Sequence, residues 1–520
     1  MIYAILVVYL IMMIGIGVYC RKKTSSVSEF VLGGRSLGGW FTAFAYGTSY
    51  FSAVVFIGYA GQFGWNYGVS ATWVGIGNAI LGSALVWLIL GRRTRTMTKS
   101  LNVSTMPEFF EKRYDSKSLK TVAAIIVFIF LIPYTASVYN GLSRLFEMAF
   151  NIDYKICITA MALLTAVYVI LGGYMATAIT DFVQGIIMLA GIVAVVICVV
   201  DGQGGFTNSL AELGKIDVGG KTEQLNSLFG PDPINLIGVI ILTSLGTWGL
   251  PQMVQKFYAI KDDAAIKKGT IISTLFAAVV AGGSYFMGGF GRLYCSADAE
   301  TATTTGRALI QTASNGKLAF DSIVPAMLQD TLPDVLIGVV VVLVLSASMS
   351  TLSSLVLTSS STLTIDLIKP NIKKEMDDKK QVFVIRILIA AFIIISVLIA
   401  LNPNAYISTL MSISWGALAG AFLAPFMYGL FSKKITKAAV WTSFITGVGI
   451  TVVHTCIFSL GFFPEATKAA ASLKINMASP INAGVIAMVA GLIVVPIVSA
   501  LTKVKDPEKV EEIFTCYSNQ

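Results

Sequence analysis

The sequence has little charge for its length. Of its 520 residues, 12% are charged and 55% are hydrophobic, whereas about a quarter of the residues are charged in an average soluble domain. The longest polar stretches, near 201–232 and 291–334, are loop-sized. Apolar runs of about 20 residues, the length that crosses a bilayer, recur from end to end instead. The composition therefore excludes a soluble protein and predicts an all-α polytopic membrane protein.

The motifs that most enzymes need are also missing. The sequence has no Walker lysine motif, no GxSxG and no HExxH, so neither an ATPase nor a hydrolase is indicated. Its single histidine, His454, has no second ligand in its apolar run, and its six cysteines show no metal-ligand spacing. We expect these residues to serve packing, and we expect no enzymatic activity and no cofactor.

Thirteen apolar runs predict about thirteen transmembrane helices. The runs lie near 2–20, 39–62, 67–91, 119–149, 153–172, 178–200, 233–259, 269–290, 335–366, 381–401, 405–431, 436–460 and 481–501. An extracellular N-terminus places 28 of the 37 Lys and Arg residues in inside loops, as the positive-inside rule requires. We therefore expect a cell-membrane protein with its C-terminus in the cytoplasm. The net charge of +9 is spread over short loops, so no nucleic-acid partner is indicated.

Two runs are interrupted in a way that helix packing alone does not require. The second run contains residues 46–50 (YGTSY) in its middle, and the seventh contains residues 246–251 (GTWGLP). Glycine and proline free backbone groups, which a bilayer tolerates only where they face protein or a water-filled cavity. Interrupted helices at matching places in two halves are typical of inverted-repeat transporters with a site at the midplane. Glycine-mediated packing is the alternative.

This reading divides the chain into two repeats of five helices. The predicted units are 1–38 (first helix and basic loop), 39–200 (first repeat), 201–232 (extracellular loop), 233–431 (second repeat, including an extracellular loop at 291–334), 432–501 (two peripheral helices) and 502–520 (cytoplasmic tail).

Sodium requires about five or six oxygen ligands, and two segments of the sequence can supply them. The interruption at 47–51 frees backbone carbonyls. The ninth run carries a dense set of hydroxyls, in which Ser350 can share one helical face with Ala347, Ser353 and Ser354. The alternative is that these hydroxyls bond back to carbonyls of their own helix.

Asp181 is an unusual residue because it lies inside the sixth run. A carboxylate there costs about 2.5–3.5 kcal/mol on insertion scales and marks a functional site by default. Its negative charge suits a cation. The alternative is a structural hydrogen bond, for example with Gln184.

Several segments together resemble the sodium:solute symporter family. They are residues 29–37 (EFVLGGRSL), 171–174 (LGGY) leading to Thr180, Asp181 and Gln184, 347–353 (ASMSTLS) followed by Asp366, and 414–416 (SWG) through Pro425. The resemblance covers nearly the whole chain, in order, and is strongest to bacterial sodium/proline symporters. It implies a LeuT-type core of ten helices, with one helix before it and two after it.

The resemblance also implies ligands for sodium. The main sodium site falls on the carbonyls of Thr48, Phe51 and Ala347 and the hydroxyls of Ser350 and Thr351. A second sodium site, which some members have, falls on Asp181, Ser353 and Ser354.

The solute is less well indicated, because the chain departs from its relatives where solutes bind. Tyr50 stands where proline symporters have an aspartate, and Val54 and Val55 stand where sugar-binding members have polar residues. An apolar lining would leave sugar hydroxyls unpaired. The candidate lining residues are Ser52, Val55, Trp248, Gln252 and Trp415.

We therefore expect a sodium-coupled symporter that imports an amino acid such as proline, a monocarboxylate or a similar solute by alternating access. Its expected partners are Na⁺, this solute and the lipid bilayer, and no obligatory protein partner is indicated. A sugar carrier of the same family, a transporter-like sensor and a channel are the alternatives.

Overall fold

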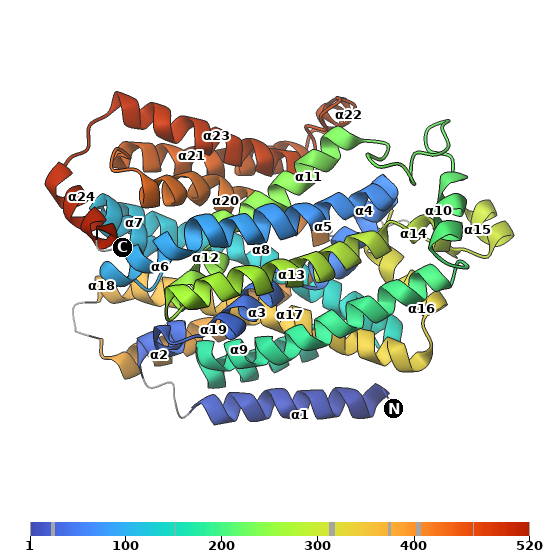
Figure 1. The fold of residues 1–520 in the computed structure, drawn as a ribbon, viewed down its shortest axis with the longest axis horizontal. Helices are drawn as coiled ribbons and strands as arrows, with labels where there is room; N and C mark the ends of the chain where they lie inside the picture. The colour runs from blue at the N-terminus through green and yellow to red at the C-terminus, as the bar shows by residue number, and fades with distance from the viewer. Residues whose placement is uncertain are drawn as a thin grey trace.

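The protein folds as a bundle of long helices. The structure, a computed structural model, describes residues 2–21, 26–150, 152–310, 318–372, 376–401, 407–460 and 462–518. The long helices lie side by side, and the two ends of the described chain lie at opposite ends of the bundle (Figure 1). Two short strands, β1 (Cys295–Ser296) and β2 (Ala308–Leu309), pair in parallel. The predicted all-α class is confirmed.

The bundle is built from helices of membrane-spanning length. They are α1 (Ile2–Arg21), α8 (Lys117–Phe150), α9 (Tyr154–Asp201), α13 (Asp263–Gly288), α17 (Asp334–Thr362), α19 (Asp378–Ala400), α20 (Ile407–Phe431), α21 (Lys437–His454) and α23 (Pro480–Leu501). Within the described residues, nine helical stretches are long and apolar enough to cross a membrane. They are Val54–Ser100 and one stretch in each of the helices above except α1, and a bent pair of helices gives a tenth span.

Two of these stretches are too long for one crossing. The helical stretch Val54–Ser100 has 47 residues and α9 has 48, so each would extend about 70 Å if straight, against a hydrocarbon core of about 30 Å. Each is interrupted once by a glycine with positive φ, Gly68 (φ +61°) in the first and Gly173 (φ +55°) in the second. Two crossings fit in each stretch, and the count of thirteen stays a prediction.

The first predicted interruption is present. Helix α3 (Gly39–Tyr50) ends at Tyr50, and the next residue, Phe51, has extended backbone angles (φ −109°, ψ 105°). The chain resumes as a π-helical segment, η2 (Val54–Tyr59), and continues as α4 (Ala60–Tyr67). The last carbonyls of α3 therefore have no helical turn after them to supply donors.

The second predicted interruption is also present. Helix α11 (Pro233–Leu245) passes through a 3₁₀ turn, η6 (Gly246–Trp248), and after a bend of 41° the chain continues as α12 (Pro251–Tyr258). Pro251 occupies the first turn of α12, where its missing N–H is not needed. A side chain at Gly249 would come within 2.7 Å of the backbone nitrogen of Leu423, so this bend requires glycine.

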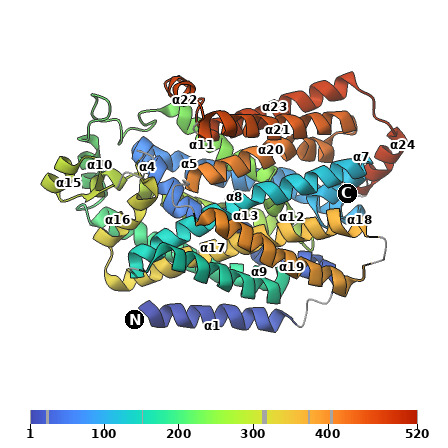
Figure 2. The same ribbon diagram turned by 180° about the vertical axis from the view of Figure 1, so that it is seen from behind.

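Helix α17 runs through the middle of the bundle, beside α9 and α19 (Figure 2). It also packs against α8 and α3, and residues 340–362 of α17 are buried throughout. Helix α20 packs against α8, α21 and α23, and it contacts both η2 and η6. Both interruptions therefore lie in the protein interior, where their free backbone groups are shielded from lipid.

Short elements cover the two ends of the bundle. At the end where α1 begins, Figure 1 shows α10 (Phe206–Gly214), α14 (Gly291–Tyr294), α15 (Ala299–Thr305) and α16 (Ile323–Thr331). At the other end it shows α2 (Val27–Leu32), α6 (Arg92–Ser100), α7 (Met106–Tyr114), α18 (Lys369–Asn371) and α24 (Pro507–Phe514). The remaining elements are η1 (Gly33–Arg35), η3 (Gly68–Ala71), α5 (Thr72–Ala79), η4 (Ile80–Leu85), η5 (Trp87–Gly91), η7 (Phe320–Ser322), η8 (Leu363–Ile368), η9 (Thr455–Ser459), α22 (Pro464–Ala471) and η10 (Thr515–Tyr517). The predicted division of the chain into domains stays a prediction.

Candidate cation and solute site

The last turn of α3 meets the middle of α17 in a cluster of oxygen atoms. The Ser350 hydroxyl donates to Thr48 Oγ1 at 2.7 Å. The Thr351 hydroxyl lies 3.3 Å from the carbonyl oxygens of both Thr48 and Ser49, and 3.1 Å from that of Ala347. One hydroxyl has one hydrogen, so it cannot satisfy three carbonyls at once. The cluster therefore has spare lone pairs, which a cation can use.

These oxygens are shielded from water. Thr48, Ser350 and Thr351 are fully buried. The carboxyl end of α3 also carries the negative end of the helix dipole, which favours a cation there. The Phe51 amide donates to the Gly47 carbonyl, and the part of the Phe51 carbonyl in the cluster stays a prediction.

The predicted second group of ligands lies about one turn further along α17. Ser354 Oγ is 2.8 Å from Ser49 Oγ, so this group adjoins the first. Ser353 Oγ instead donates to the Ser350 carbonyl at 2.9 Å, which is the intrahelical bonding expected of a membrane serine. The alternative of bonding within the helix thus holds for Ser353, and the sodium-ligand interpretation of the other hydroxyls stays a prediction.

Asp181 is completely buried in α9, and neither of its carboxylate oxygens makes a hydrogen bond within the described chain. The positive charge of Lys256 acts on this carboxylate from beyond ion-pair distance. The alternative bond to Gln184 is not formed, because the Gln184 amide donates to the Tyr9 hydroxyl at 2.9 Å.

Lys256 lies in α12 and is 2% exposed. Its Nζ donates to Ser354 Oγ at 2.8 Å and lies 5.1 Å from the centre of the Tyr174 ring. This lysine is not among the candidate site residues predicted from the sequence. The signal that could have identified it was its position within the seventh apolar run, 233–259, because an ionisable residue inside a span marks a functional site.

The five candidate lining residues are all buried, so the structure is closed over them. Two have their polar atoms engaged: Trp248 Nε1 donates to the Leu81 carbonyl at 2.9 Å, and Ser52 Oγ accepts from the Val54 amide at 3.2 Å. Gln252 Oε1 and Trp415 Nε1 have no hydrogen-bond partner in the described part of the chain. Buried polar atoms are rarely left unpaired, so these two are the groups most available to a solute.

Aromatic rings join the ion cluster to this lining. Tyr50, next to Ser49, stacks on Trp415 with ring centres 6.1 Å apart, and its hydroxyl donates to the Thr243 carbonyl of α11. Tyr134 packs edge-on against Trp415 at 6.0 Å. The residues of the first interruption therefore contact both the predicted cation ligands and Trp415, one of the candidate lining residues.

Comparison with known proteins decides the family. The profile of the sodium:solute symporter family matches residues 30–447. The chain belongs to this family. Sodium:solute symporters are membrane transporters, so the protein is a multi-pass transporter that couples a small solute to sodium.

Two relatives of this symporter are proline transporters. The osmoregulated proline transporter OpuE of Bacillus subtilis is 29% identical over 449 residues, which cover 86% of this chain and 87% of the relative. The sodium/proline symporter of Staphylococcus aureus is 31% identical over 464 residues, which cover 87% of this chain and 85% of the relative.

Solved structures agree on the fold of the symporter. A Na⁺-coupled sialic acid symporter in its substrate-bound outward-open state superposes with a TM-score of 0.70 at 19% identity, over 96% of this chain and 98% of that one. The nucleobase-cation symporter MHP1 gives 0.51 at 12% identity, over 95% and 99%. The predicted LeuT-type core is thereby confirmed.

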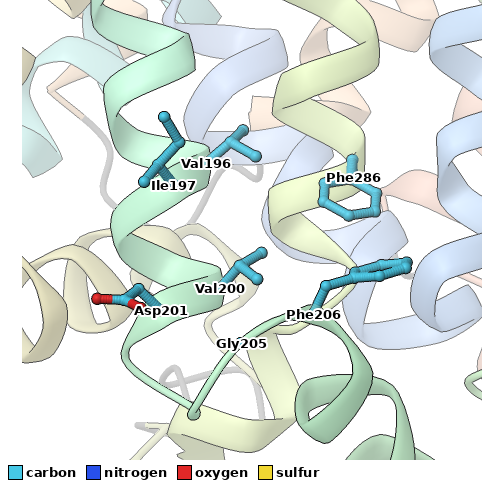
Figure 3. Close-up of a pocket in the computed structure, with 7 residues that line it drawn as sticks. All are labelled: Val196, Ile197, Val200, Asp201, Gly205, Phe206 and Phe286. Atoms are coloured by element: carbon cyan, nitrogen blue, oxygen red, sulfur yellow. The ribbon is translucent and has the colours of Figure 1, made fainter.

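A groove on the symporter lies away from these ligands. It has a volume of about 510 Å³ and lies between α9, the start of α10 and α13; it is lined by Val196, Ile197, Val200, Asp201, Gly205, Phe206 and Phe286. Figure 3 shows the Asp201 carboxylate pointing away from the two phenyl rings. The remaining wall is apolar, which suits a lipid chain better than a charged solute.

Proposed function

We propose that the protein imports a small zwitterion or carboxylate across the cell membrane and binds its coupling sodium between the end of α3 and the middle of α17. The observation that carries the ion site is the Thr351 hydroxyl, which faces three carbonyl oxygens at 3.1–3.3 Å. The proposed ligands are the carbonyls of Thr48, Phe51 and Ala347 and the hydroxyls of Ser350 and Thr351. Ser49, whose carbonyl also faces Thr351, is an additional candidate.

In this proposal sodium acts by joining two elements that otherwise share few bonds. Bound sodium pulls the end of α3 onto α17 and favours the conformation that accepts solute from outside. Coupling requires that sodium bind this state better than the other, since equal affinity would shift nothing. Solute binding then permits the change to the inward-open state, where sodium leaves.

The driving force is sufficient for accumulation. One charge crossing 100 mV releases about 2.3 kcal/mol, and a tenfold sodium gradient adds roughly 1.4 kcal/mol. Their sum of about 3.7 kcal/mol sustains about a 500-fold gradient of a neutral solute.

Proline is the first solute to test. Gln252 Oε1 can accept from a solute ammonium and Trp415 Nε1 can donate to a carboxylate, while Val55 supplies an apolar surface. A sugar needs more hydrogen-bond partners than these side chains offer. Both relatives named above are proline transporters.

The proposed orientation has the N-terminus outside and the C-terminus in the cytoplasm. The basic segment Arg92–Lys99 and the tail helix α24 lie at the same end of the bundle, opposite the start of α1 (Figure 1). The positive-inside rule assigns that end to the cytoplasm. Cysteine-accessibility labelling of a residue placed in α15 and of one in α24, in intact cells and in inverted vesicles, tests this orientation.

The proposed function is tested by uptake of radiolabelled proline into proteoliposomes under an inward sodium gradient. We expect uptake to require sodium and to increase with an inside-negative potential. Equal uptake with potassium would overturn the sodium site. A sodium current without any solute would favour a channel. If proline is not transported, thermal shifts of the purified protein with amino acids, monocarboxylates and sugars, each with and without sodium, identify the solute class.

A further inference from the structure

A second pocket lies at the end of the bundle that carries α6 and the tail helix α24 (Figure 1). Its volume of about 540 Å³ falls within the range of ligand pockets, about 300–1,000 Å³. It is enclosed by the start of α6, by the end of α20 with the residues that follow, and by the tail. None of the described residues that line it is acidic. Its cations are Arg93, Lys433 and Lys434, and its aromatic rings are Phe431, Phe514 and Tyr517.

The guanidinium group of Arg93 is held in place by its neighbours. It lies 4.4 Å from the centre of the Phe431 ring and 4.8 Å from that of Tyr517. Its Nη1 donates to the Leu430 carbonyl at 3.0 Å, and the Tyr517 hydroxyl donates to the Arg93 carbonyl at 3.0 Å. A guanidinium group has five N–H donors, and one of them donates within the described part of the chain. The other donors are therefore available to a ligand.

Acidic side chains compensate only part of the positive charge in this pocket. Lys433 forms an ion pair with Glu511 of α24. Arg93 and Lys434 form no ion pair with any acidic residue that the structure describes. An anion with several acceptor oxygens can bind both cations at once, and phosphate matches the fork of N–H groups on an arginine. The chemistry of the pocket therefore suits a phosphate group.

The pocket also adjoins the surface that faces the lipid. Leu88 and Ile89 lie about one turn before Arg93 and are 66% and 38% exposed, and Phe431, the last residue of α20, is 43% exposed. Exposed apolar side chains thus directly precede the basic residues on both helices. Basic pockets between membrane helices are typical binding places for anionic lipid headgroups. Acyl chains can lie against Leu88 and Ile89 while the headgroup reaches Arg93 and Lys434.

We propose that this pocket binds the phosphate group of an anionic lipid from the leaflet at this end of the bundle, which is the cytoplasmic leaflet in the proposed orientation. The phosphate oxygens accept from the free N–H groups of Arg93 and from the Lys434 ammonium group. Each basic residue near an anionic lipid surface contributes about a fivefold gain in affinity. The pocket shares no residue with the candidate cation and solute site, so the inference goes beyond the proposed function.

The test is native mass spectrometry of the purified full-length protein, delipidated in detergent and titrated with phosphatidylglycerol or with phosphatidylcholine, which has a phosphate but no net charge. The variants are Arg93→Gln, Lys434→Gln and the double variant. Lys99→Gln is the matched control, because it removes the same charge from an exposed position of α6 outside the pocket.

We expect the wild type to bind one phosphatidylglycerol molecule about thirtyfold more tightly than phosphatidylcholine. Each single variant should bind it about fivefold more weakly and the double variant about thirtyfold more weakly, with the control within about twofold of the wild type. Equal binding of the two lipids by the wild type would overturn the inference, and so would an equal loss in Lys99→Gln.

A second measurement separates a lipid from a free anion. We expect inorganic phosphate alone to leave the melting temperature of the wild type unchanged, because it has no acyl chains to bind beside the pocket. Stabilisation by phosphate that is lost in the double variant would identify a free-anion site and overturn the lipid assignment. If Arg93→Gln fails to fold, Lys434→Gln decides, because Lys434 is exposed. Sodium-dependent uptake tests the proposed function separately.

Discussion

The oxygen cluster around Thr351 and the Lys256–Ser354 hydrogen bond lie about one turn apart along α17, yet they differ in chemistry. The first consists of neutral oxygens around Thr351, where three carbonyl acceptors face a single hydroxyl donor. The second contains the buried Lys256 side chain of α12, which donates to Ser354 Oγ, and Ser354 in turn contacts Ser49 Oγ. The α3–α17 cluster of neutral oxygens can gain and lose an ion, because it carries no net charge when no ion is bound. A buried charged group is costly unless it is paired or neutralised, so substitutions in the second region should affect stability more.

The largest expected effect on stability comes from removing the buried Lys256 side chain. Lys256→Met removes the hydrogen bond to Ser354 Oγ, and loss of a hydrogen bond to a charged group costs about 1.5–3 kcal/mol. We expect a melting temperature several degrees lower in sodium-free buffer, partly restored by sodium. The double variant Asp181→Asn/Lys256→Met should lose less than the sum of the single variants. Additive losses in the thermal-shift measurement would mean that the two residues act independently.

Removing one ligand from the α3–α17 cluster should affect sodium affinity more than stability. Thr351→Ala removes a ligand worth about 2 kcal/mol as a charge-assisted contact, so the sodium concentration for half-maximal uptake should rise about 30-fold. Thr351→Ser keeps the hydroxyl and should stay near the wild type. Thr135→Ala is the matched control, because that buried hydroxyl only donates to the Leu131 carbonyl of its own helix. Unchanged sodium dependence of uptake in Thr351→Ala would contradict the assignment of Thr351 as a sodium ligand.

A smaller effect is expected at the candidate lining residues for the solute. Gln252→Ala removes an acceptor that is unpaired in the structure, and loss of one hydrogen bond to a charged group costs about 1.5 kcal/mol. The KM for the solute should rise about tenfold, with sodium affinity changed less than threefold. An equal change in both constants would show that Gln252 acts through the ion cluster.

The smallest effect concerns a carboxylate outside both regions. Burial raises the pKa of Asp321 to about 6, although the Ile407 amide and Arg144 oppose the shift. The folded state therefore favours the protonated form. This stabilisation is complete below pH 3.8 and is lost as the pH rises through about 6.

Asp321→Asn should remove this pH dependence and raise the melting temperature by a degree or two at pH 7.5. The effect is small because the side chain is partly exposed. Melting temperatures of both proteins between pH 4 and 8 provide the check. Parallel curves would contradict the assignment of this pH dependence to Asp321.

The sequence predicted those features that depend on local pattern. Glycine and proline mark the ends of α3 and α11 because each acts on its own backbone, so both interruptions were found. The helical periodicity of the ninth run indicated Ser350 in the same way, whereas Thr351 was indicated by the family resemblance. The number of crossings was harder, because it depends on how the chain turns at Gly68 and Gly173.

Contacts between distant segments were not predictable from local pattern. Lys256 and Ser354 are 98 positions apart, and nothing near either residue indicates that they meet. Gln184 faces Tyr9 of α1 rather than Asp181, which follows from how α1 packs on α9. Local composition indicated that Asp181 was unusual, but the burial of Lys256 against Ser354 follows only from how α12 packs on α17.

The four residues Thr48–Phe51 have a mechanical consequence. Their backbone and hydroxyl oxygens face α17, while the Tyr50 ring lies against Trp415 and the Phe51 ring against Phe276. A rotation of this short stretch displaces the ligands of the cation and the aromatic wall together. Binding of the ion and binding of the solute are therefore coupled directly, because both act on the same four residues.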